Sequence, residues 1–405
     1  MSHAIAPLPV TVLNGFLGAG KTTLLQNLLV QARSLSEIRL AVIVNEMSEL
    51  DIDGLILDTS EVLSLDDELL VPIPAGSISG PEGLKRLAAA VDQVRSAGAS
   101  HIIIETSGSA HPWPLLGAIR AHDSLQLRGF LTIVDTVTLA QDHDLGRSIV
   151  PAASRNLAAN RRGIENLLAE QIMFSNRIVL SKMDRIPMER LQTVAESIHP
   201  INPGADIVAM QWGNLKLSDV LAMAPYDHAR VATLGAELTD WDKKHGASSM
   251  ASAEDYRIRS VVISDPRPFH PQRLWDVYNH YLGTGIYRSK GFFWLPTRDR
   301  LQLLWNQTAG SVGLAIVNFW KVAALEDETL NLLPEERQEL QRRLKDLSPE
   351  FGDRHCRLTV IGDHTGLDTF AEALRGCFCT SREVAQWKAG HKFDDPWPTE
   401  TAHLF

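Results

Sequence analysis

The sequence predicts an α/β protein in which a mainly parallel sheet covered by helices is followed by a second, smaller α/β domain. Short apolar runs alternate with helical stretches from residue 8 to about residue 222. Such alternation is typical of a parallel sheet that is covered on both faces. A complete phosphate-loop motif lies between the first strand and the first helix of this series. A similar alternation begins again near residue 256, after a stretch rich in Gly, Ala and Ser.

The composition is that of a soluble globular protein, with 44% hydrophobic and 22% charged residues. At 405 residues the chain is long enough for two or three domains. Its 49 acidic residues outnumber its 39 basic ones, which argues against electrostatic binding of nucleic acid. There is no apolar run of membrane-spanning length and no secretory signal pattern, and the three cysteines are too few for a disulfide scaffold. We therefore expect a cytoplasmic protein with neither nucleic-acid nor membrane partners.

The first strand is expected at 10–13 and the first helix at 22–33, and the loop that joins them reads Gly-Phe-Leu-Gly-Ala-Gly-Lys-Thr over residues 15–22. Its glycines let backbone N–H groups turn toward phosphate oxygens at the positive end of the helix. Lys21 is placed to reach the β- and γ-phosphates, and the Thr22 hydroxyl is placed to bind Mg²⁺. The motif therefore predicts a nucleoside triphosphate site. Its expected contacts are Gly15, Gly18, Ala19, Gly20, Lys21, Thr22 and Thr23.

The remaining elements follow from the same apolar periodicity. In the first domain, further strands are expected at 40–44, 101–104, 130–134, 178–180 and 206–208, and helices at 81–97, 112–121, 157–174 and 187–198. In the second, we expect a strand at 257–263, a helix at 270–282, strands within 286–317, a charged helix at 334–347, a strand at 357–361 and a helix at 366–375. These elements predict a nucleotide-binding domain at 1–222, a linker at 223–255, a second domain at 256–380 and an extended tail at 381–405.

A base-reading motif is expected where Ser181-Lys182-Met183-Asp184 follows a strand. It is similar to the Asn-Lys-x-Asp sequence with which GTPases bind guanine. A carboxylate accepts hydrogen bonds from both N1–H and the exocyclic amine of guanine, whereas adenine offers no such pair of donors. We therefore expect Ser181, Lys182 and Asp184 to contact a guanine base. The alternative is a solvated turn after a buried strand.

A phosphate-sensing turn is expected at Glu105-Thr-Ser-Gly108, directly after the strand at 101–104. At this position an acidic residue holds Mg²⁺, and a glycine N–H meets the γ-phosphate. Glu105 and Thr22 are thus the expected Mg²⁺ residues, and Lys21, Glu105 and Gly108 the expected catalytic residues. Alone, such a sequence is also that of an ordinary turn.

Taken together, the phosphate loop, Asn45-Glu46, the 105–108 turn and the 181–184 motif resemble the CobW-type GTPase family of metal chaperones and metal-site activators. The stretches 269–275, 285–295 and 358–362 resemble its C-terminal domain, so the likeness covers nearly the whole chain. It implies a GTPase domain followed by a smaller α/β domain, with GTP and Mg²⁺ as ligands. It also implies slow GTP hydrolysis coupled to metal delivery to a client metalloprotein.

The chain departs from this family at the signature Cys-x-Cys-Cys motif. Residues 74–80 read Pro-Ala-Gly-Ser-Ile-Ser-Gly, so Ser77, Ser79 and Gly80 occupy the three cysteine positions. Thiolates are strong ligands for transition metals, whereas a neutral hydroxyl is a poor one. We therefore expect this loop to bind zinc, cobalt or iron only weakly.

Other residues are candidates for a metal site. His111 stands where the family usually has an aspartate, and it is either a ligand or proton carrier or a structural histidine at a helix start. Glu46, Glu49, Asp51 and Asp53 lie together after the second strand and form either an Mg²⁺ site or a solvated acidic switch loop.

The cysteines of the second domain are a further candidate. Cys377 and Cys379 are two residues apart, and Cys356 and His355 lie in the same domain. They form either a late thiolate site or buried, inert core residues.

Two functions remain open at this level. The first is an Mg²⁺-dependent GTPase that delivers a metal to a client metalloprotein. The second is a nucleotide-gated regulator or scaffold that has lost its transition-metal site. A kinase or ATP-dependent transferase is disfavoured, because Asp184 suits guanine.

Overall fold

The computed structural model describes residues 7–33, 35, 38–45, 69–73, 78–245, 258–281, 285–308, 311–327, 333–345, 347–348, 350–363, 366–398 and 402–403. The chain divides into two compact units, Met1–Ile258 and Arg259–Phe405. Within the described ranges, the helices are too short or too polar for any of them to cross a membrane.

The centre of the first unit is a sheet of seven strands. They are β1 (Leu8–Asn14), β2 (Leu40–Asn45), β3 (Leu70–Ile73), β4 (His101–Glu105), β5 (Leu125–Asp135), β6 (Arg177–Ser181) and β7 (Asp206–Ala209). Their order across the sheet is β3-β2-β4-β1-β5-β6-β7, and every pair runs parallel. The predicted α/β fold is confirmed, and the strand that leads into the phosphate loop lies in the middle of the sheet.

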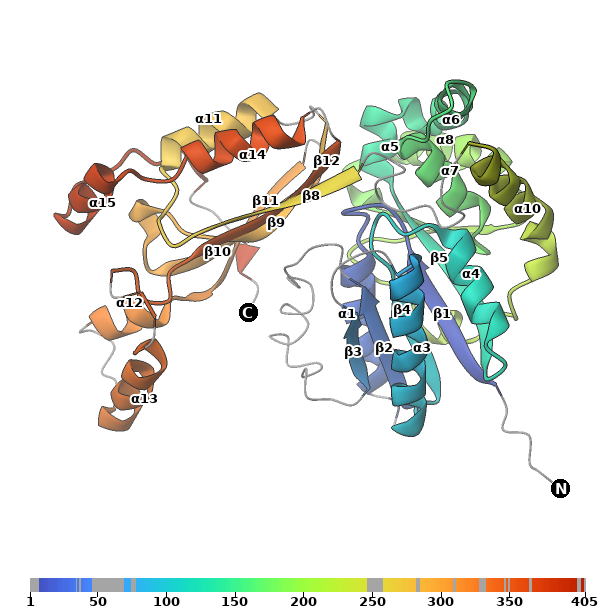
Figure 1. Cartoon of the computed structure of the whole chain (residues 1–405), viewed down its shortest axis with the longest axis horizontal. Coiled ribbons are helices and arrows are strands. Elements are labelled where there is room, and N and C mark those ends of the chain that lie inside the picture. The colour runs from blue at the N-terminus through green and yellow to red at the C-terminus, as the bar shows by residue number, and fades with distance from the viewer. Residues whose placement is uncertain are drawn as a thin grey trace. The chain divides into compact units, whose positions relative to one another are not determined.

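Helices cover both faces of this sheet. They are α1 (Lys21–Arg33), α3 (Pro81–Ser96), α4 (Pro112–Ala121), α5 (Thr136–Asp142), α6 (Ile149–Ala158), α7 (Ile164–Met173), α8 (Met188–Ile198), α9 (Leu217–Leu221) and α10 (His228–His245). Apolar residues of α3, α4 and α10 pack on one face, and those of α1 and α9 on the other. Figure 1 shows α3 and α4 side by side over their face.

The two faces follow from the alternation of side chains along each strand. In β4, Ile102 and Ile104 join the core under α3 and α4, whereas Ile103 joins the core under α1. All three are completely buried. A strand buried on both sides reads as a continuous apolar run, which is why these strands could be recognised in the sequence.

Several elements of the first unit differ from the prediction. Strand β3 and helices α5, α6 and α9 lie outside the predicted set. In place of the single helix expected at 157–174, α6 ends at Ala158 and α7 begins only at Ile164, because Asn160 takes a positive φ of 53° and Gly163 is extended. The segment expected as a linker contains α10, which packs Val231, Leu234 and Leu238 against the sheet at helical spacing.

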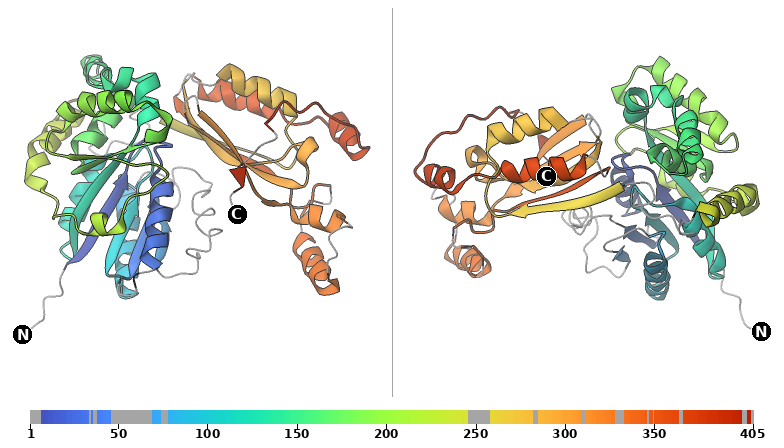
Figure 2. Two further views of the ribbon diagram at one scale, coloured as in Figure 1. Left: turned by 180° about the vertical axis from the view of Figure 1, so that it is seen from behind. Right: turned by 45° about the horizontal axis from the view of Figure 1, so that its top comes forward.

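The second unit is built on a mainly antiparallel sheet. Its strands are β8 (Ile258–Asp265), β9 (Ile286–Phe293), β10 (Leu301–Thr308), β11 (Ser311–Phe319), β12 (Cys356–Asp363) and β13 (Ala402–His403), in the order β13-β11-β10-β9-β12-β8. Its helices are α11 (Pro271–Tyr281), α12 (Lys321–Glu326), α13 (Pro334–Leu344), α14 (Leu367–Gly376) and α15 (Ser381–Lys388). Figure 2 shows α11 and α14 side by side on the sheet, and both contribute to the core of this unit. The expected second α/β domain is confirmed.

The segment after Thr380 differs from the extended tail that the sequence suggests. Thr380 caps α15, and its hydroxyl and the Glu383 carboxylate form a reciprocal capping box. Further along, the ring of Trp397 is buried against the rings of Tyr278 and Trp305. This segment therefore contributes to the core of the second unit.

Candidate nucleotide-binding site

The phosphate loop connects β1 to α1 through glycines with positive φ. The angle is 137° at Gly15, 71° at Gly18 and 100° at Gly20, a conformation that residues with a Cβ rarely adopt. At Gly15 a Cβ would also lie 2.2 Å from the carbonyl oxygen of Ile133 on β5. The loop thus passes directly against the neighbouring strand, and Gly15 is required by both conformation and space.

Lys21, the first residue of α1, turns its side chain back over this loop. The residue is only 6% exposed. Its Nζ donates to the carbonyl oxygens of Gly15 at 2.7 Å and Phe16 at 3.2 Å. These contacts fix a positive charge within the loop, beside the N–H groups at the helix start, where phosphates bind.

Thr22 and Glu105 are brought together from α1 and the end of β4. The Thr22 hydroxyl donates to Oε1 of Glu105 at 2.7 Å. Glu105 is buried, whereas Thr23, the next residue along α1, is exposed. A hydroxyl and a carboxylate side by side are the hard oxygen ligands that Mg²⁺ prefers.

The turn after β4 lies close against the phosphate loop. A Cβ on Gly108 would meet Cδ2 of Leu17 at 2.5 Å and its backbone nitrogen at 2.6 Å. The Thr106 hydroxyl donates to Oδ1 of Asn14 at 2.9 Å, and Nε2 of Gln171 on α7 donates to the Gly108 carbonyl at 3.2 Å. The expected sensor turn is therefore held beside the phosphate loop by β1 and α7.

Asn45, the last residue of β2, joins this turn to the loop that precedes α3. Its Oδ1 accepts from the backbone N–H of Ile78 at 3.0 Å and of Ser107 at 3.3 Å. The Asn45 amide in turn donates to the carbonyl of Ile73 at 3.3 Å. One buried side chain thus couples the sensor turn to the loop at the family's cysteine positions.

The base-reading motif begins at the end of β6, beside the phosphate loop. Ser181 donates its hydroxyl to the carbonyl of Ala19 at 2.7 Å. Lys182 follows with a positive φ of 55°, and its Nζ lies 2.5 Å from Oδ2 of Asp135. Asp184 is exposed at the surface. Ser181 therefore positions the loop, while Asp184 is open to a ligand.

Sequence reasoning missed Asp135, the last residue of β5. Besides pairing with Lys182, it caps α5 by accepting from the N–H groups of Val137 and Thr138 at 2.9 and 3.3 Å. The available signal was an aspartate directly before a helix start, which is a preferred N-cap.

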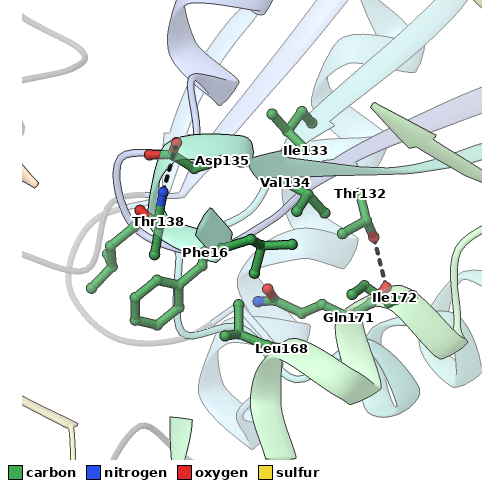
Figure 3. Close-up of a pocket in the computed structure, with 11 residues that line it drawn as sticks. Phe16, Thr132, Ile133, Val134, Asp135, Thr138, Leu168, Gln171 and Ile172 are labelled. Atoms are coloured by element: carbon green, nitrogen blue, oxygen red, sulfur yellow. Dashed lines mark hydrogen bonds between the residues drawn. The ribbon is translucent and has the colours of Figure 1, made fainter. Parts of the chain in front are cut away.

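A pocket lies between the phosphate loop, the end of β5 and α7. Figure 3 shows the ring of Phe16, the side chain of Leu168 and the amide of Gln171 facing the same space. Oε1 of Gln171 is buried and has no hydrogen-bond partner among the described residues. The same side chain that holds Gly108 thus also lines this pocket.

His111 is buried at the start of α4 with protein groups at both ring nitrogens. Nδ1 accepts from the N–H of Trp113 at 3.3 Å, and Nε2 lies 3.4 Å from Glu170. Arg162 donates to the same carboxylate at 2.9 Å. Burial, followed by the charge of Arg162, lowers the pKa of His111 to about 3, so the ring is neutral near pH 7.

The loop at the cysteine positions contacts this histidine. Ser79 is completely buried, and its hydroxyl oxygen accepts from the backbone N–H of His111 at 3.1 Å. Gly80 is the N-cap residue of α3. Ser77 lies outside the described residues, and so do Glu46, Glu49, Asp51 and Asp53.

The three cysteines are buried in the second unit. Burial raises the pKa of Cys377 and Cys379 to about 12, and it also raises the pKa of Cys356. These thiols are therefore neutral near pH 7. Within the described ranges, no three His, Cys, Asp or Glu side chains gather as a metal-binding group.

Comparison with known proteins gives two family matches. Residues 9–209 match the CobW/HypB/UreG nucleotide-binding domain, and residues 258–378 match the cobalamin synthesis protein CobW C-terminal domain. Together these matches span the cores of both units.

Several known proteins are similar to this chain. The zinc-regulated GTPase metalloprotein activator 1 of Dictyostelium discoideum is 30% identical over 397 residues, which cover 93% of this chain and 81% of that protein. The zinc chaperone CobW of a Sinorhizobium species is 31% identical over 202 residues, which cover 47% of this chain and 55% of that protein. Among solved structures, the Zn(II)-bound YjiA GTPase from E. coli is 19% identical, with 93% of this chain and all of that chain covered and a TM-score of 0.34. With both matching domains and a relative 30% identical over 93% of its length, the chain belongs to the CobW/HypB/UreG family of nucleotide-binding proteins and also carries a CobW C-terminal domain.

Proposed function

We propose that this protein is an Mg²⁺-dependent GTPase that couples GTP hydrolysis to metal delivery to, or activation of, a client metalloprotein. The observation that carries the proposal is the 2.7 Å contact between Thr22 and Glu105 beside the buried ammonium of Lys21. This contact places the hydroxyl of Thr22 and the carboxylate of Glu105 together next to the Lys21 ammonium at the N-terminus of α1. This is the combination that phosphoryl-transfer sites use.

The residues present fit both GTP and Mg²⁺. A Cβ at Gly108 would clash with Leu17 of the phosphate loop, and a Cβ at Gly15 would clash with Ile133 of β5, so the cradle depends on glycine at both positions. Oγ of Ser107 is buried beside this cradle without a hydrogen-bond partner among the described residues. A buried hydroxyl in that state favours a polar ligand nearby.

Each side chain has a distinct part in the proposed reaction. Lys21 holds the β- and γ-phosphates, Thr22 and Glu105 hold Mg²⁺, and the N–H of Gly108 donates to the γ-phosphate. Mg²⁺, when bound, supplies positive charge that offsets the negative charge developing on the phosphate oxygens. Asn45 links the sensor turn to the loop at residues 78–80, because its Oδ1 accepts hydrogen bonds from the backbone N–H of both Ser107 and Ile78.

Guanine is the base that we propose. Asp184 is exposed in the segment that follows β6. Its carboxylate can accept hydrogen bonds from the two adjacent donors of guanine. Ser181 and Lys182 support this position through Ala19 and Asp135, respectively.

The two candidate functions, metal delivery and regulation, differ in whether the protein binds a transition metal. Relatives named as a zinc-regulated GTPase metalloprotein activator and as a zinc chaperone favour a transition metal as cargo. The buried Ser79 hydroxyl, which accepts from the His111 N–H in place of a family thiolate, favours a regulator that acts through protein contacts. We propose delivery as the main function and regulation as the alternative.

The test is GTP and ATP hydrolysis by the full chain with Mg²⁺ and with EDTA, followed by Zn²⁺ and Co²⁺ titrations with GTP present. GTP turnover that requires Mg²⁺ supports the GTPase. Stoichiometric metal binding tighter than about micromolar, or 8 kcal/mol, supports delivery. Turnover without such binding supports the regulator, and absence of GTP binding overturns both.

A further inference from the structure

Trp212 is an unusually exposed aromatic side chain at the nucleotide edge of the sheet. It lies in the loop that follows β7, and it is 70% exposed. Tryptophan is highly buried on average, since it is the largest apolar side chain. An indole left in water at the ligand edge of a parallel sheet is a candidate ligand contact.

The topology places this loop beside the base-reading motif. β6 and β7 are parallel neighbours with Leu180 opposite Ala209, and the N–H of Met210 donates to the Leu180 carbonyl at 2.7 Å. The loops that follow β6 and β7 therefore begin side by side. Within the same loops, the guanidinium carbon of Arg185 lies 5.9 Å from the centre of the Trp212 ring.

The backbone holds Trp212 in this exposed position. Its φ is 53°, in the left-handed region that side chains with a Cβ seldom adopt. The next residue, Gly213, has a φ of 71°, and a Cβ there would lie 2.6 Å from the carbonyl oxygen of Thr23. The loop is thus pressed against the first turn of α1, and the strain at Trp212 is maintained by that contact. Strain of this kind occurs chiefly at functional sites.

Lys182 has nearly the same conformation, with a φ of 55°, directly after β6. Both base-side loops therefore turn sharply at a residue that is not glycine. One turn leads to Asp184, and the other exposes the ring of Trp212.

We propose that Trp212 stacks on the nucleobase of the bound nucleotide. This inference rests on the proposed GTP site and adds to it a residue that recognises the face of the base, while Asp184 recognises its edge. An aromatic ring stacks on any purine, so Trp212 contributes affinity and Asp184 contributes selectivity for guanine.

The test compares Trp212→Ala with Trp212→Phe by calorimetry of GTP, GDP and ATP binding to the full chain with Mg²⁺. Aromatic–base stacking predicts that Trp212→Ala weakens the binding of each nucleotide by a similar factor, between about fivefold and 150-fold. Trp212→Phe, which keeps a ring, should recover most of this loss. In turnover assays, KM for GTP should rise by the same factor, with kcat changed by less than about twofold, because base stacking is shared by the ground and transition states.

Phe319 is the matched control, because it is an aromatic residue with 56% exposure in the second unit. Phe319→Ala should leave nucleotide affinity as in the wild type. GTP should also quench part of the tryptophan emission of the wild type, and this change should be lost in Trp212→Phe.

The outcomes separate the inference from the function on which it rests. Wild-type affinity in Trp212→Ala, together with loss of affinity in Lys21→Ala, would overturn stacking while the GTP site stands. A loss that is equally large in Trp212→Phe would also overturn it, since a ring would then not be the active feature. A wild-type chain that binds no GTP would overturn both.

Discussion

The hydroxyl of Thr22 and a carboxylate oxygen of Glu105 are joined by a 2.7 Å hydrogen bond. The two residues are 83 positions apart in the chain, and they meet because β4 lies next to β1 in the sheet. The two oxygens therefore already lie side by side, as the proposed Mg²⁺ site requires.

We predict that Thr22→Ala raises the Mg²⁺ concentration needed for half-maximal turnover by at least about tenfold, which corresponds to about 1.4 kcal/mol. Glu105→Gln should slow turnover while GTP affinity stays similar, because its carboxylate acts on the metal and the γ-phosphate end. Steady-state kinetics over a range of Mg²⁺ concentrations checks both. Ser96→Ala is the control, since Ser96 is an exposed hydroxyl residue at the end of α3, outside the proposed site. Wild-type turnover in Glu105→Gln would show that this carboxylate has no part in the reaction.

Lys21→Ala should abolish GTP binding or hydrolysis and leave far-UV circular dichroism unchanged. The ammonium is the buried charge within the phosphate loop, held by the carbonyls of Gly15 and Phe16. Calorimetry with GTP is the measurement. Lys85→Ala, an exposed lysine of α3, serves as the control. If Lys21→Ala bound and hydrolysed GTP normally, the phosphate-loop assignment would be wrong.

The wild type should bind GTP at least about tenfold more tightly than ATP, a difference of about 1.4 kcal/mol. Asp184→Asn should narrow this difference, because an amide that donates at one end cannot accept both guanine hydrogen bonds. Competition binding with both nucleotides tests this. Asp92→Asn, an exposed aspartate of α3, should keep the selectivity. Equal affinities in the wild type would refute the guanine assignment.

The loop at residues 76–80 should bind Zn²⁺ or Co²⁺ no more tightly than about micromolar, since structural zinc sites depend on deprotonated thiolates and imidazoles. The triple substitution Ser77→Cys, Ser79→Cys and Gly80→Cys should create a site with the visible absorption of tetrahedral Co²⁺–thiolate. The backbone at position 80 suits a residue with a Cβ, because Gly80 has a φ of −80°.

The control for the metal site is the pair Ser77→Ala and Ser79→Ala in the native sequence. Tight binding that these changes remove would contradict the prediction. Tight binding that survives them would instead direct attention to His111, to the acidic stretch around Glu46 and Glu49, or to Cys377 and Cys379.

His111 should make stability depend on pH. Its pKa is about 3 in the folded protein and near 6.5 when exposed. The unfolded chain therefore takes up a proton between these values while the folded one does not, so this contribution to stability is present above pH 6.5 and is lost as the pH falls. From pH 7 to pH 5 the loss is about 2 kcal/mol. In the same unit, burial and the charge of Arg128 lower the pKa of His101 to about 4, which acts in the same direction.

His111→Asn tests this contribution, because asparagine is a good N-cap but does not titrate. Urea unfolding of the variant should show a smaller fall in stability between pH 7 and pH 5 than the wild type. His199→Asn is the matched control, since His199 is exposed in the same unit. An unchanged pH dependence in His111→Asn would mean that the buried ring has no part in it.

Motif spacing was sufficient to predict that the loop at 15–22, the turn at 105–108 and the segment at 181–184 each follow a strand of the sheet, because each is a local feature of the sequence. Their contacts with nucleotide stay predictions. The parallel sheet could likewise be predicted, since strands buried on both faces read as continuous apolar runs. Helix α15 was missed although its capping box, Thr380 with Glu383, is visible in the sequence.

Contacts that depend on strand order could not be predicted. Asn45 reaches Ser107 only because β2 and β4 are neighbours, and Asp135 reaches Lys182 only because β5 and β6 are. Nothing local to any of these residues indicates its partner. The contact between Ser79 and His111 is of the same kind, since it joins the start of α3 to the start of α4.

The hydrogen bond from Ser181 to Ala19 connects positions 162 residues apart. The phosphate loop is thus completed by segments from nearly the full length of the first unit, and an unfolded chain has no part of the site that could bind alone. A nucleotide at a thousandfold excess over its dissociation constant would then stabilise the whole unit by about 4 kcal/mol. Resistance to proteolysis, and with it the lifetime of the protein, would rise and fall with the supply of nucleotide.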